Sequence, residues 1–439
     1  MEPKRVLILG GGFAGLSCAR KLANDKRFGV TLIDRTNHHL FQPLLYQVAT
    51  ASLAAPDIAR SLRQILEKAS NVTAFMDEID AIDTGAKTAT GKSGRQYEWD
   101  YLVLATGAQT SFFGNDDWER NTLGLKTLEE AQRIRRTVLS NLEQAELTGD
   151  PAERRRLMTV AIVGGGPTGV ELSGAFADLV HRSMRSEFRQ IDTSTLRIIL
   201  IEGSSRILEA YDEDQSEYAR VRLKSLGVDV WTGRRVCGVE HEKLVFTDGR
   251  TLEASAIIWA AGVQASPLTR QFDVEPADRG GRLEPLPDLS LPGHPDVFVV
   301  GDLVRMKDID GVPVPGVAPA AVQMGDHVAK VLKEELRLEK TRFADRKHEL
   351  RPGFRYRDKG LMAIIGKNHA VVKSGKLRLR GYAAWMAWLL VHILFLIGFR
   401  NKLAVLLSWA FAYLRNSPGA RIIVHPPGTE PKHSAPTPP

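Results

Sequence analysis

The stretch Val6-Leu7-Ile8-Leu9-Gly10-Gly11-Gly12-Phe13-Ala14-Gly15 decides the fold of this chain. It joins a short apolar run to the pattern G-x-G-x-x-G, after which a helix is expected. The first glycine permits a tight strand-to-helix turn, the second lets a pyrophosphate touch the backbone, and the third lets the helix pack on the strand. The free N–H groups at the helix start then favour phosphate. The stretch therefore predicts a dinucleotide-binding unit with Gly10, Gly12 and Gly15 at its turn.

A second copy of this pattern runs Val160-Ala161-Ile162-Val163-Gly164-Gly165-Gly166-Pro167-Thr168-Gly169. The alternative for either copy is a plain glycine turn. However, each copy is followed by a strand that ends in an acid, Asp34 or Glu202, where a carboxylate can accept hydrogen bonds from a ribose diol. Glu202 repels the 2′-phosphate of NADP and so favours NADH, although Arg206 nearby could blunt this preference. Two dinucleotides held by one chain indicate electron transfer between them.

Later strands extend the repeat. Residues 100–107 end in the small-residue turn Ala105-Thr106-Gly107, and residues 256–262 end in Gly262. A further apolar strand ends in Gly301-Asp302, and a helix is expected from Pro319. We therefore expect an α/β fold with two Rossmann-like dinucleotide-binding domains, the second inserted into the first, followed by a C-terminal membrane-associated helical segment.

The expected domain boundaries follow from these strands. They are 1–115 and 270–332 for the first dinucleotide-binding domain, 116–269 for the second, 333–380 for a C-terminal cap with short strands, 381–416 for membrane-anchoring helices and 425–439 for a disordered tail. The charged residues 333–351 are expected to face solvent, and the tail is rich in proline.

Composition narrows the chemistry. The 439 residues, of which 43% are hydrophobic and 25% charged, suggest a globular protein of about three domains. The two cysteines, Cys18 and Cys237, form no C-x-x-C pair, so neither a dithiol centre nor a cysteine zinc site is indicated, and no metal constellation is seen. The net charge of +7 suggests an anionic partner. Basic residues before the one long apolar segment favour an anionic lipid surface, and no nucleic-acid module is recognised.

Three segments resemble a known family more closely than the fingerprints alone. They are Asn37-His38-His39-Leu40-Phe41-Gln42-Pro43-Leu44-Leu45-Tyr46-Gln47-Val48-Ala49-Thr50, the stretch from Gly164 to Glu171, and Gly398-Phe399-Arg400-Asn401. With the two fingerprints they resemble the two-dinucleotide-fold flavoproteins. Within that superfamily they resemble the type II NADH dehydrogenases, single-subunit NADH:quinone oxidoreductases. The resemblance covers residues 4 to 424.

The resemblance implies two cofactor sites. FAD would lie in the first fold, with Asp34 at its ribose and Asp302 at its ribitol. The other residues implied at FAD are Gly10, Gly12, Ala14, Gly15, Pro43, Gln47, Ala105, Thr106 and Gly107. NADH would lie in the second fold, and the residues implied there are Gly164, Gly166, Thr168, Gly169, Glu171, Glu202 and Gly262. Taken without the family, Asp302 could equally cap a turn, and the loop around Gln47 could be a packed aromatic cluster.

Four residues are implied near the chemistry: Glu171, Gln323, Gln47 and Lys359. Glu171 is implied where nicotinamide meets flavin, although an acid near a helix start is also favoured by the dipole alone. The family often carries A-Q-x-A-x-Q where quinone meets flavin. This chain has Pro319 in place of the first glutamine and keeps the second as Gln323, which puts the quinone geometry in doubt. Lys359 could equally be a surface residue.

The segment from Ala383 to Phe399 is apolar except for His392. As a helix it would be about 25 Å long, short of the roughly 30 Å hydrocarbon core. A second apolar run, 403–414, follows Arg400-Asn401-Lys402. Aromatic residues such as Trp388 and Trp409 suit a membrane interface, so we expect two helices lying on or dipping into the bilayer. A buried core helix, a homodimer interface and a single span are the alternatives.

The function expected from these features is hydride transfer from NADH to FAD, followed by two-electron reduction of a membrane quinone. The enzyme would be peripheral, or monotopic, on the cytoplasmic face of the inner or plasma membrane. A sulfide:quinone oxidoreductase is one alternative, but it would need cysteines beside the flavin, and Cys18 and Cys237 are unsuitably placed. A non-catalytic NADH-binding redox sensor is the other. The sequence leaves the quinone's identity and the oligomeric state, including a homodimer, open.

Overall fold

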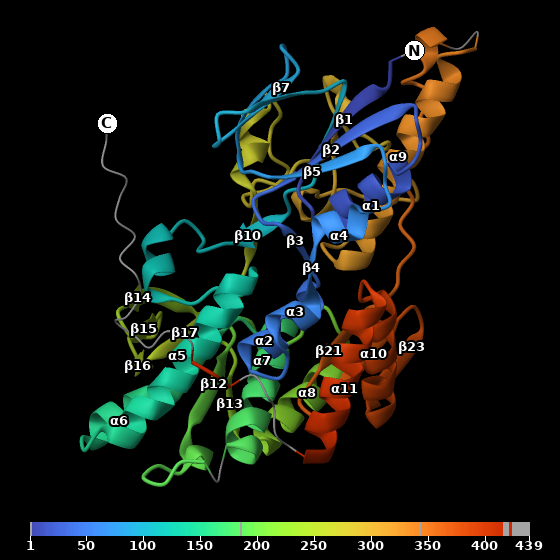
Figure 1. Cartoon of the computed structure of the whole chain (residues 1–439). Coiled ribbons are helices and arrows are strands. Elements are labelled where there is room, and N and C mark those ends of the chain that lie inside the picture. The colour runs from blue at the N-terminus through green and yellow to red at the C-terminus, as the bar shows by residue number, and fades with distance from the viewer. Residues whose placement is uncertain (1, 185–186, 342–343, 416–420, 424–439) are drawn as a thin grey trace. The chain divides into compact units, whose positions relative to one another are not determined.

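The computed structural model describes residues 2–184, 187–341, 344–415 and 421–423, which form two compact units (Figure 1). The first unit comprises Met1–Leu40, Ala59–Ser111 and Val263–Lys359. The second comprises Phe41–Ile58, Phe112–Gly262 and the described residues from Gly360 onward. The second unit is therefore inserted into the first, as the sequence predicted. The predicted tail, 425–439, lies outside the described residues.

The chain passes between the units at Ser111/Phe112 and at Gly262/Val263. β10 (Ala108–Thr110) and β18 (Val263–Ala265) pair antiparallel inside the first unit, so the chain leaves and re-enters that unit at adjacent points. Two segments fall differently from the predicted domains. Residues 41–58 join the second unit, and the expected cap at 333–380 is divided at Lys359.

A six-stranded sheet forms the core of the first unit. Its strands, in sheet order, are β19 (Ser290–Leu291), β20 (His294–Val299), β9 (Tyr101–Leu104), β1 (Lys4–Leu9), β2 (Phe28–Asp34) and β5 (Val72–Met76). All neighbours run parallel except β19 and β20. Every residue of β9 is buried, because a parallel sheet covered on both faces buries continuous apolar runs.

Two helices of the first unit pack against each other. α1 (Phe13–Leu22) lies beside α9 (Ala318–Leu338) in Figure 1. A Cβ at Gly325 would lie 2.0 Å from the Ala14 carbonyl oxygen, so the close approach of the two helices requires glycine there. The smaller elements of this unit are β3 (His38–Leu40), β4 (Ala59–Ser61), α4 (Leu62–Leu66), β6 (Ile79–Asp83), β7 (Thr88–Gly91), β8 (Gln96–Glu98), η5 (Pro267–Gln271), η6 (Gly301–Leu303) and η7 (Ala344–Arg346).

The expectation that 333–351 faces solvent is wrong for part of this segment. α9 continues through Glu335, which is 1% exposed. Its carboxylate accepts a hydrogen bond from the Tyr101 hydroxyl at 2.8 Å and pairs with the buried guanidinium of Arg351, which also pairs with Asp288 at 3.0 Å. Charges that are fully paired and hydrogen-bonded in this way can be buried, which a count of charges along the sequence does not reveal.

The second unit repeats the central strands of the first. Its parallel sheet has the order β13 (Val228–Trp231), β12 (Arg197–Ile201), β11 (Thr159–Val163) and β17 (Ala256–Trp259). This order matches β5-β2-β1-β9 strand for strand, and both are the order of a dinucleotide-binding half. The predicted pair of Rossmann-like domains is thus confirmed.

The second unit also contains α7 (Pro167–Asp178), which packs on β12, α2 (Leu45–Ala49) and β21 (Leu361–Ile364). The unit's other helices are η1 (Gln42–Leu44), α3 (Ala55–Ile58), η2 (Asp116–Asn121), α5 (Leu128–Leu147), α6 (Pro151–Leu157), η3 (Leu179–Ser183), η4 (Thr193–Thr195) and α8 (Glu213–Ser225). One antiparallel sheet contains β14 (Val236–Glu240), β15 (Lys243–Phe246) and β16 (Thr251–Glu253). A second one contains β21, β22 (Ala370–Ser374) and β23 (Leu377–Gly381), and it packs on α7 and α8.

The C-terminal apolar region forms two helices, α10 (Tyr382–Phe395) and α11 (Phe399–Arg415), which lie side by side in Figure 1. The apolar segment from Ala383 to Phe399 is therefore not one continuous helix, because residues 396–398 are not helical. Among the residues that the structure describes, no helix combines the length and apolar character needed to cross a bilayer.

Candidate functional site

The first glycine loop has the geometry that its sequence predicts. Gly10 has φ +106°, and a Cβ there would lie 2.3 Å from the Ala105 carbonyl oxygen. A Cβ at Gly15 would lie 2.0 Å from the oxygen of Gly10, so α1 can start this close to β1 only with glycine. At Gly12, by contrast, an added Cβ would meet nothing within 4 Å. The open side of the loop is therefore available to a phosphate.

Asp34 closes this loop from the end of β2. One carboxylate oxygen accepts the backbone N–H of Gly11 at 2.6 Å, and the other accepts the N–H and hydroxyl of Thr36 at 2.7 and 2.8 Å. His39 supports the loop from the other side, with Nδ1 2.9 Å from the Gly11 carbonyl oxygen. Since a carbonyl only accepts, Nδ1 must carry the proton, and burial lowers the pKa of this histidine.

The remaining predicted FAD residues of the first unit follow the ends of β9 and β20. Ala105 is buried, and Gly107 has φ +66°. The Thr106 hydroxyl is buried without a hydrogen-bond partner among the described residues, which leaves it able to bond a ligand. Asp302 stands in η6, and its Oδ1 would lie 3.6 Å from a Cβ added at Gly316. The open loop, the unpaired hydroxyl and the carboxylates together fit a dinucleotide with a polyol.

The second glycine loop reproduces the first almost atom for atom. Gly164 has φ +113°, and a Cβ at Gly169 would lie 1.9 Å from the Gly164 oxygen, whereas one at Gly166 would meet nothing. Glu202 accepts the N–H of Gly165 at 2.6 Å and the N–H of Ser204 at 2.7 Å. Its role in the loop thus matches that of Asp34.

Three residues frame this second loop. Thr168 is exposed at the start of α7. Gly262 has φ +78°, and an added Cβ would lie 2.6 Å from the Phe113 ring. Arg206, the residue considered as a counterweight to Glu202, donates to the carbonyl oxygens of Tyr211 and Glu209 and to the Ser216 hydroxyl. These bonds hold its guanidinium against the loop that precedes α8.

Glu171 lies one turn further along α7 and has unusual electrostatics for a carboxylate. Burial raises its pKa to about 8, against an opposing backbone hydrogen bond from Ile364 N–H at 3.3 Å. Trp388 also lowers the pKa slightly, although its indole N–H makes no hydrogen bond of normal geometry within the described residues. Glu171 therefore carries a proton over much of the neutral pH range, which suits proton handling.

Pro43 and Gln47, which the resemblance implies at FAD, belong to the second unit, in η1 and α2. The Gln47 amide is fully engaged there. Its Nε2 donates to the Tyr46 hydroxyl oxygen at 2.9 Å, and its Oε1 accepts the Trp409 indole N–H at 2.7 Å. Gln47 is 7% exposed, so this amide is a buried link between α2 and α11.

Gln323 is likewise bonded to its own unit. Its Nε2 donates to the carbonyl oxygens of Pro319 and Arg357, and its Oε1 accepts the Arg357 N–H at 3.0 Å. The amide thus fastens the segment that ends at Lys359 to α9. Lys359 itself is exposed, at the last residue of the first unit.

Four aromatic residues of the second unit interact with Glu171 or bond to Gln47 and were not assigned a site role from the sequence: Tyr46, Tyr211, Trp388 and Trp409. Burial raises the pKa of both tyrosines, and the nearby Glu171 raises each further. The Tyr211 hydroxyl is buried without a partner among the described residues. Tyr46 stood in the family-like segment but carried no signal of its own. No spacing rule connects Trp409 with Gln47, because their positions are so distant in the chain.

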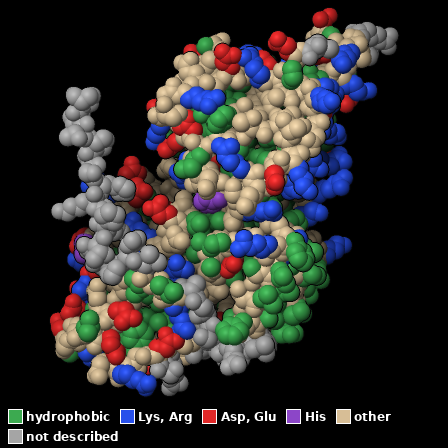
Figure 2. Space-filling model, viewed as in Figure 1, with side chains coloured by type: hydrophobic (Ala, Val, Ile, Leu, Met, Phe, Trp, Pro, Cys, Tyr) green, Lys and Arg blue, Asp and Glu red, His purple; other side chains and the backbone are tan. Residues whose placement is uncertain are grey.

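Apolar side chains gather on α10 and α11, as Figure 2 shows. We call this group the apolar face; its exposed members are Tyr382, Met386, Leu390, Leu394, Phe395, Phe399, Leu403, Leu406, Leu407 and Phe411. The sequence prediction that Trp388 suits an interface is wrong, because Trp388 is fully buried. It stacks on His392 with ring centroids 4.0 Å apart, and burial lowers the pKa of His392 to about 4.

The basic residues before α10 are partly committed to protein partners. Lys373 and Arg378 both pair with Asp212. Lys376 and Arg380 are exposed on the same hairpin, and Arg400 is exposed at the start of α11. The exposed basic residues beside the apolar face are therefore mainly Lys376, Arg380 and Arg400.

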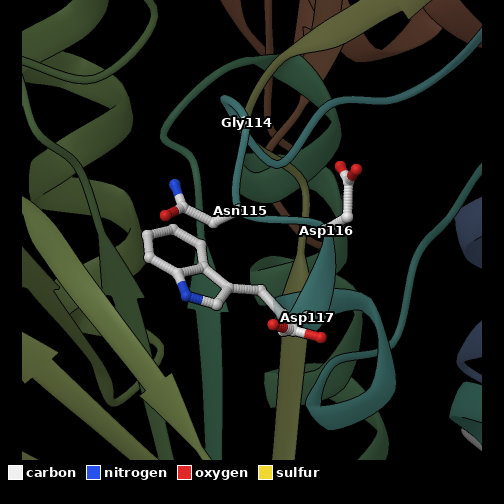
Figure 3. A pocket seen from close by; sticks show the side chains of 5 residues that line it. Gly114, Asn115, Asp116 and Asp117 are labelled. Carbon is white, nitrogen blue, oxygen red and sulfur yellow. The ribbon is translucent and has the colours of Figure 1, made fainter.

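Two surface hollows lie in the second unit. A shallow hollow of about 380 Å³ is lined by residues 114–118. Figure 3 shows the side chains of Asn115 and Asp116 projecting to opposite sides of its turn, so they do not converge on a ligand. A smaller one, about 180 Å³, lies beside Leu123 and Ile257. Neither contains a glycine-loop residue.

Cys18 is buried in α1 and belongs to the first unit, whereas Cys237 is exposed on β14 of the second. Burial raises the pKa of the Cys18 thiol to about 12. No group of three or more His, Cys, Asp or Glu side chains is placed to hold a metal ion in the part of the chain that the structure describes.

Comparisons with known proteins agree with this geometry. Residues 4–325 match the pyridine nucleotide-disulphide oxidoreductase family. The type II NADH:quinone oxidoreductase Ndh of Mycobacterium tuberculosis is 39% identical over 94% of this chain and 89% of its own. An internal alternative NAD(P)H-ubiquinone oxidoreductase A1 of Arabidopsis thaliana mitochondria is 30% identical over 94% of this chain and 84% of its own. The solved structure of NDH2 from Plasmodium falciparum in complex with NADH superposes with a TM-score of 0.85 at 20% identity, covering 94% of this chain and 99% of that one.

Proposed function

The chain belongs to the type II NADH:quinone oxidoreductases of the pyridine nucleotide-disulphide oxidoreductase family, and we propose that it oxidises NADH and reduces a quinone through FAD. The observation that carries this proposal is the duplicated site. Two glycine loops, each open at its second glycine and each closed by a carboxylate from the next strand, stand on one chain. Bound FAD supplies the chemistry of accepting a hydride and passing two electrons on.

The first unit would hold FAD. The loop at Gly12, Ala14 and Gly15 would bind its pyrophosphate at the α1 N-terminus, with Asp34 at the ribose. The unpaired Thr106 hydroxyl and the Asp302 carboxylate offer further polar contacts, and the latter is a strong acceptor for a polyol hydroxyl.

The second unit would hold NADH around Gly166, Thr168 and the start of α7. Glu202 would accept the ribose hydroxyls and repel a 2′-phosphate, so we propose NADH rather than NADPH. Glu171 lies on the same helix beyond the glycine loop. Its raised pKa allows it to hold a proton near neutral pH and to release it when its surroundings change.

A quinone would need polar side chains of this chain to bond its carbonyl groups. Pro319 offers no side-chain amide, and the Gln323 amide is already bonded to Arg357. A quinone carbonyl would therefore bond Gln323 only by displacing these contacts. We propose that the exposed Lys359 takes a larger share of this task than in relatives with both glutamines.

The apolar face would attach the protein peripherally to a membrane on its cytoplasmic side. Neither described helix of this face is long and apolar enough to cross a membrane. The face is flanked by the exposed Lys376, Arg380 and Arg400, which favour anionic lipid. Sedimentation with anionic vesicles, but weakly with neutral ones, is expected. A homodimer that buries the face would instead abolish sedimentation and double the mass in solution.

A direct assay tests the proposed activity. Purified protein is mixed with NADH and a short-chain quinone, and the absorbance of NADH is followed. We expect NADH consumption that requires both the bound flavin and the quinone. Sulfide-driven quinone reduction would point to the sulfide:quinone oxidoreductase alternative, and protein that carries FAD but shows no turnover would point to a sensor.

A further inference from the structure

The middle glycine of each nucleotide loop has a carbonyl oxygen that accepts a hydrogen bond from outside the loop. At Gly11 the donor is Nδ1–H of His39, with the two heavy atoms 2.9 Å apart, and at Gly165 it is the backbone N–H of Leu208, at 2.8 Å. The first loop therefore depends on a side chain at the place where the second depends only on the main chain. A substitution can remove the first donor, whereas almost any residue would supply the second.

These hydrogen bonds fix the orientation of the peptide that joins the middle glycine to the next one. In a trans peptide the C=O and the following N–H point in opposite directions, and the peptide bonds of the described residues are trans. The N–H of Gly12 therefore points away from His39, and that of Gly166 points away from Leu208. Within the described residues, neither N–H donates to a protein group. Both are thus available to a phosphate at the start of α1 or α7.

The backbone of the two loops shows that these peptides are oriented alike. Gly12 has φ −70° and ψ −163°, and Gly166 has φ −72° and ψ −177°. In the second loop the donor comes from a strained position, because Leu208 has φ +52°, in the left-handed region that leucine rarely occupies. A donor to the middle carbonyl is therefore kept in both units by unrelated means, which indicates that the peptide orientation matters to both.

The surroundings of His39 leave Nδ1 as the nitrogen that carries the proton. His39 lies on β3, opposite Arg60 of β4, and is 3% exposed. Its ring meets that of Phe13, the first residue of α1, edge to face with centroids 5.1 Å apart. Its Nε2 is buried without a partner among the described residues, so a proton there would be unsatisfied. The carbonyl oxygen beside Nδ1, by contrast, needs a donor.

We propose that His39 is a positioning residue for FAD, whose Nδ1–H holds the peptide between Gly11 and Gly12 so that the N–H of Gly12 is directed at the FAD pyrophosphate. This role rests on the proposed function, because it places FAD at the first loop. It makes the two units unequal, since NADH at the second loop needs no side chain for the same orientation. His39 acts through the loop and does not itself have to touch the cofactor.

The dissociation constant of FAD measures this role, through the flavin fluorescence that appears when the purified holoprotein is diluted. His39→Leu removes the donor and should raise this constant about ten- to a hundredfold, because a misdirected N–H loses its hydrogen bond to a charged group. The phosphorus NMR resonances of bound FAD should shift as well. His38→Leu, the same substitution at the neighbouring, partly exposed histidine, is the matched control and should change neither.

Two amide variants separate hydrogen bonding from packing. In His39→Asn the amide nitrogen stands where Nδ1 stands in histidine, so the affinity for FAD should stay close to that of the wild type. In His39→Gln the nitrogen lies further out, at the position of Nε2, so the affinity should fall as in His39→Leu. Binding of NAD⁺, measured by calorimetry, should be unchanged in all these variants, because Leu208 donates from the main chain.

An unchanged FAD affinity in His39→Leu would overturn the role of His39, as would equal FAD affinities in His39→Asn and His39→Gln. An equal loss of NAD⁺ affinity would show a general structural effect and overturn it too. Should His39→Leu fail to fold, the comparison of the two amide variants decides. A wild type that binds FAD but does not reduce quinone would end the proposed activity and leave these titrations to decide on His39. A wild type that takes up no FAD would overturn both.

Discussion

The two nucleotide-binding units contain equivalent glycine turns, but different elements pack on the helix that follows each turn. Gly10 and Gly164, Gly15 and Gly169, and the loop carboxylates occupy equivalent places with nearly equal distances. The helix covers are different, because α1 packs on α9 and α7 packs on α2 and β21. The phosphate-binding turn is thus a fixed local solution, and chemical specialisation enters through the layer placed over the helix.

One pair of equivalent positions makes this difference concrete. Ser17 stands two residues after Gly15 and donates to Asp326 of α9 at 2.6 Å. Glu171 stands two residues after Gly169, where burial raises its pKa to about 8. The same helical position is a helix–helix contact in one unit and a proton-holding candidate in the other.

The largest expected effect comes from the third glycine of each loop. Gly15→Ala would bring a Cβ to 2.0 Å from a backbone oxygen and Gly169→Ala to 1.9 Å. Strain of about 1–3 kcal/mol is expected at each turn. The affinity for the nucleotide bound at that turn should therefore fall about ten- to a hundredfold. Gly15→Ala should lower the flavin content, measured by absorbance, whereas Gly169→Ala should keep flavin and raise the KM for NADH.

The matched controls are Gly29→Ala in the first unit and Gly149→Ala in the second, where an added Cβ meets nothing. Both should bind flavin and NADH as the wild type does. Flavin loss from Gly169→Ala with flavin retention in Gly15→Ala would reverse the assignment of the two units.

Glu202 should decide between the two nicotinamide cofactors. Glu202→Ala removes the charge that repels a 2′-phosphate, so kcat/KM for NADPH relative to NADH should rise about ten- to a hundredfold. Steady-state kinetics with both cofactors measure the ratio. Asp34→Ala, the equivalent change in the first unit, should leave that ratio unchanged and weaken flavin binding; a changed ratio would contradict the assignment.

Glu171 should make stability depend on pH in a way that Ser17 does not. Its folded pKa lies above the ordinary value, so burial carries no penalty below pH 4.5, and the penalty grows until about pH 8. Glu171→Gln should therefore gain unfolding temperature over the wild type between pH 5 and 9. Ser17→Ala should lose about 0.5–1.5 kcal/mol at every pH. If the difference in unfolding temperature between Glu171→Gln and the wild type did not change across this pH range, Glu171 would not have the raised pKa described.

The smallest effects concern the cysteines. Cys18 is buried with a strongly raised pKa, whereas Cys237 is exposed. Iodoacetamide should label one thiol per folded chain, and none in Cys237→Ser. That variant should keep full NADH oxidation. A thiol-based electron relay needs two cysteines that can form a disulfide, and the two cysteines of this chain are both free. Loss of activity in Cys237→Ser would favour a thiol-dependent mechanism.

Features with a local cause could be predicted from the sequence. The glycine turns, the acid-ended strands and the insertion of one unit into the other follow from spacing within short segments, and the structure has each of them. The start of α9 at Ala318, next to Pro319, was predictable because proline suits a helix start.

Features that depend on distant partners could not be predicted in this way. Glu335 is buried because Arg351 and Tyr101 meet it, and Gln47 is fixed because Trp409 reaches it from α11. Residues 41–58 join the second unit because Asn401 donates to the backbone of Pro56 and Asp57, among other contacts. Each of these pairings joins positions that no periodicity relates.

The central claim is that one chain holds a flavin and oxidises NADH through it for a quinone. An anaerobic absorption spectrum tests it most directly, recorded for the purified protein, after one equivalent of NADH, and after a short-chain quinone. The account predicts a yellow protein whose flavin band bleaches with NADH and returns with quinone. A colourless protein that takes up no FAD, or a flavin band that NADH does not bleach, would contradict it.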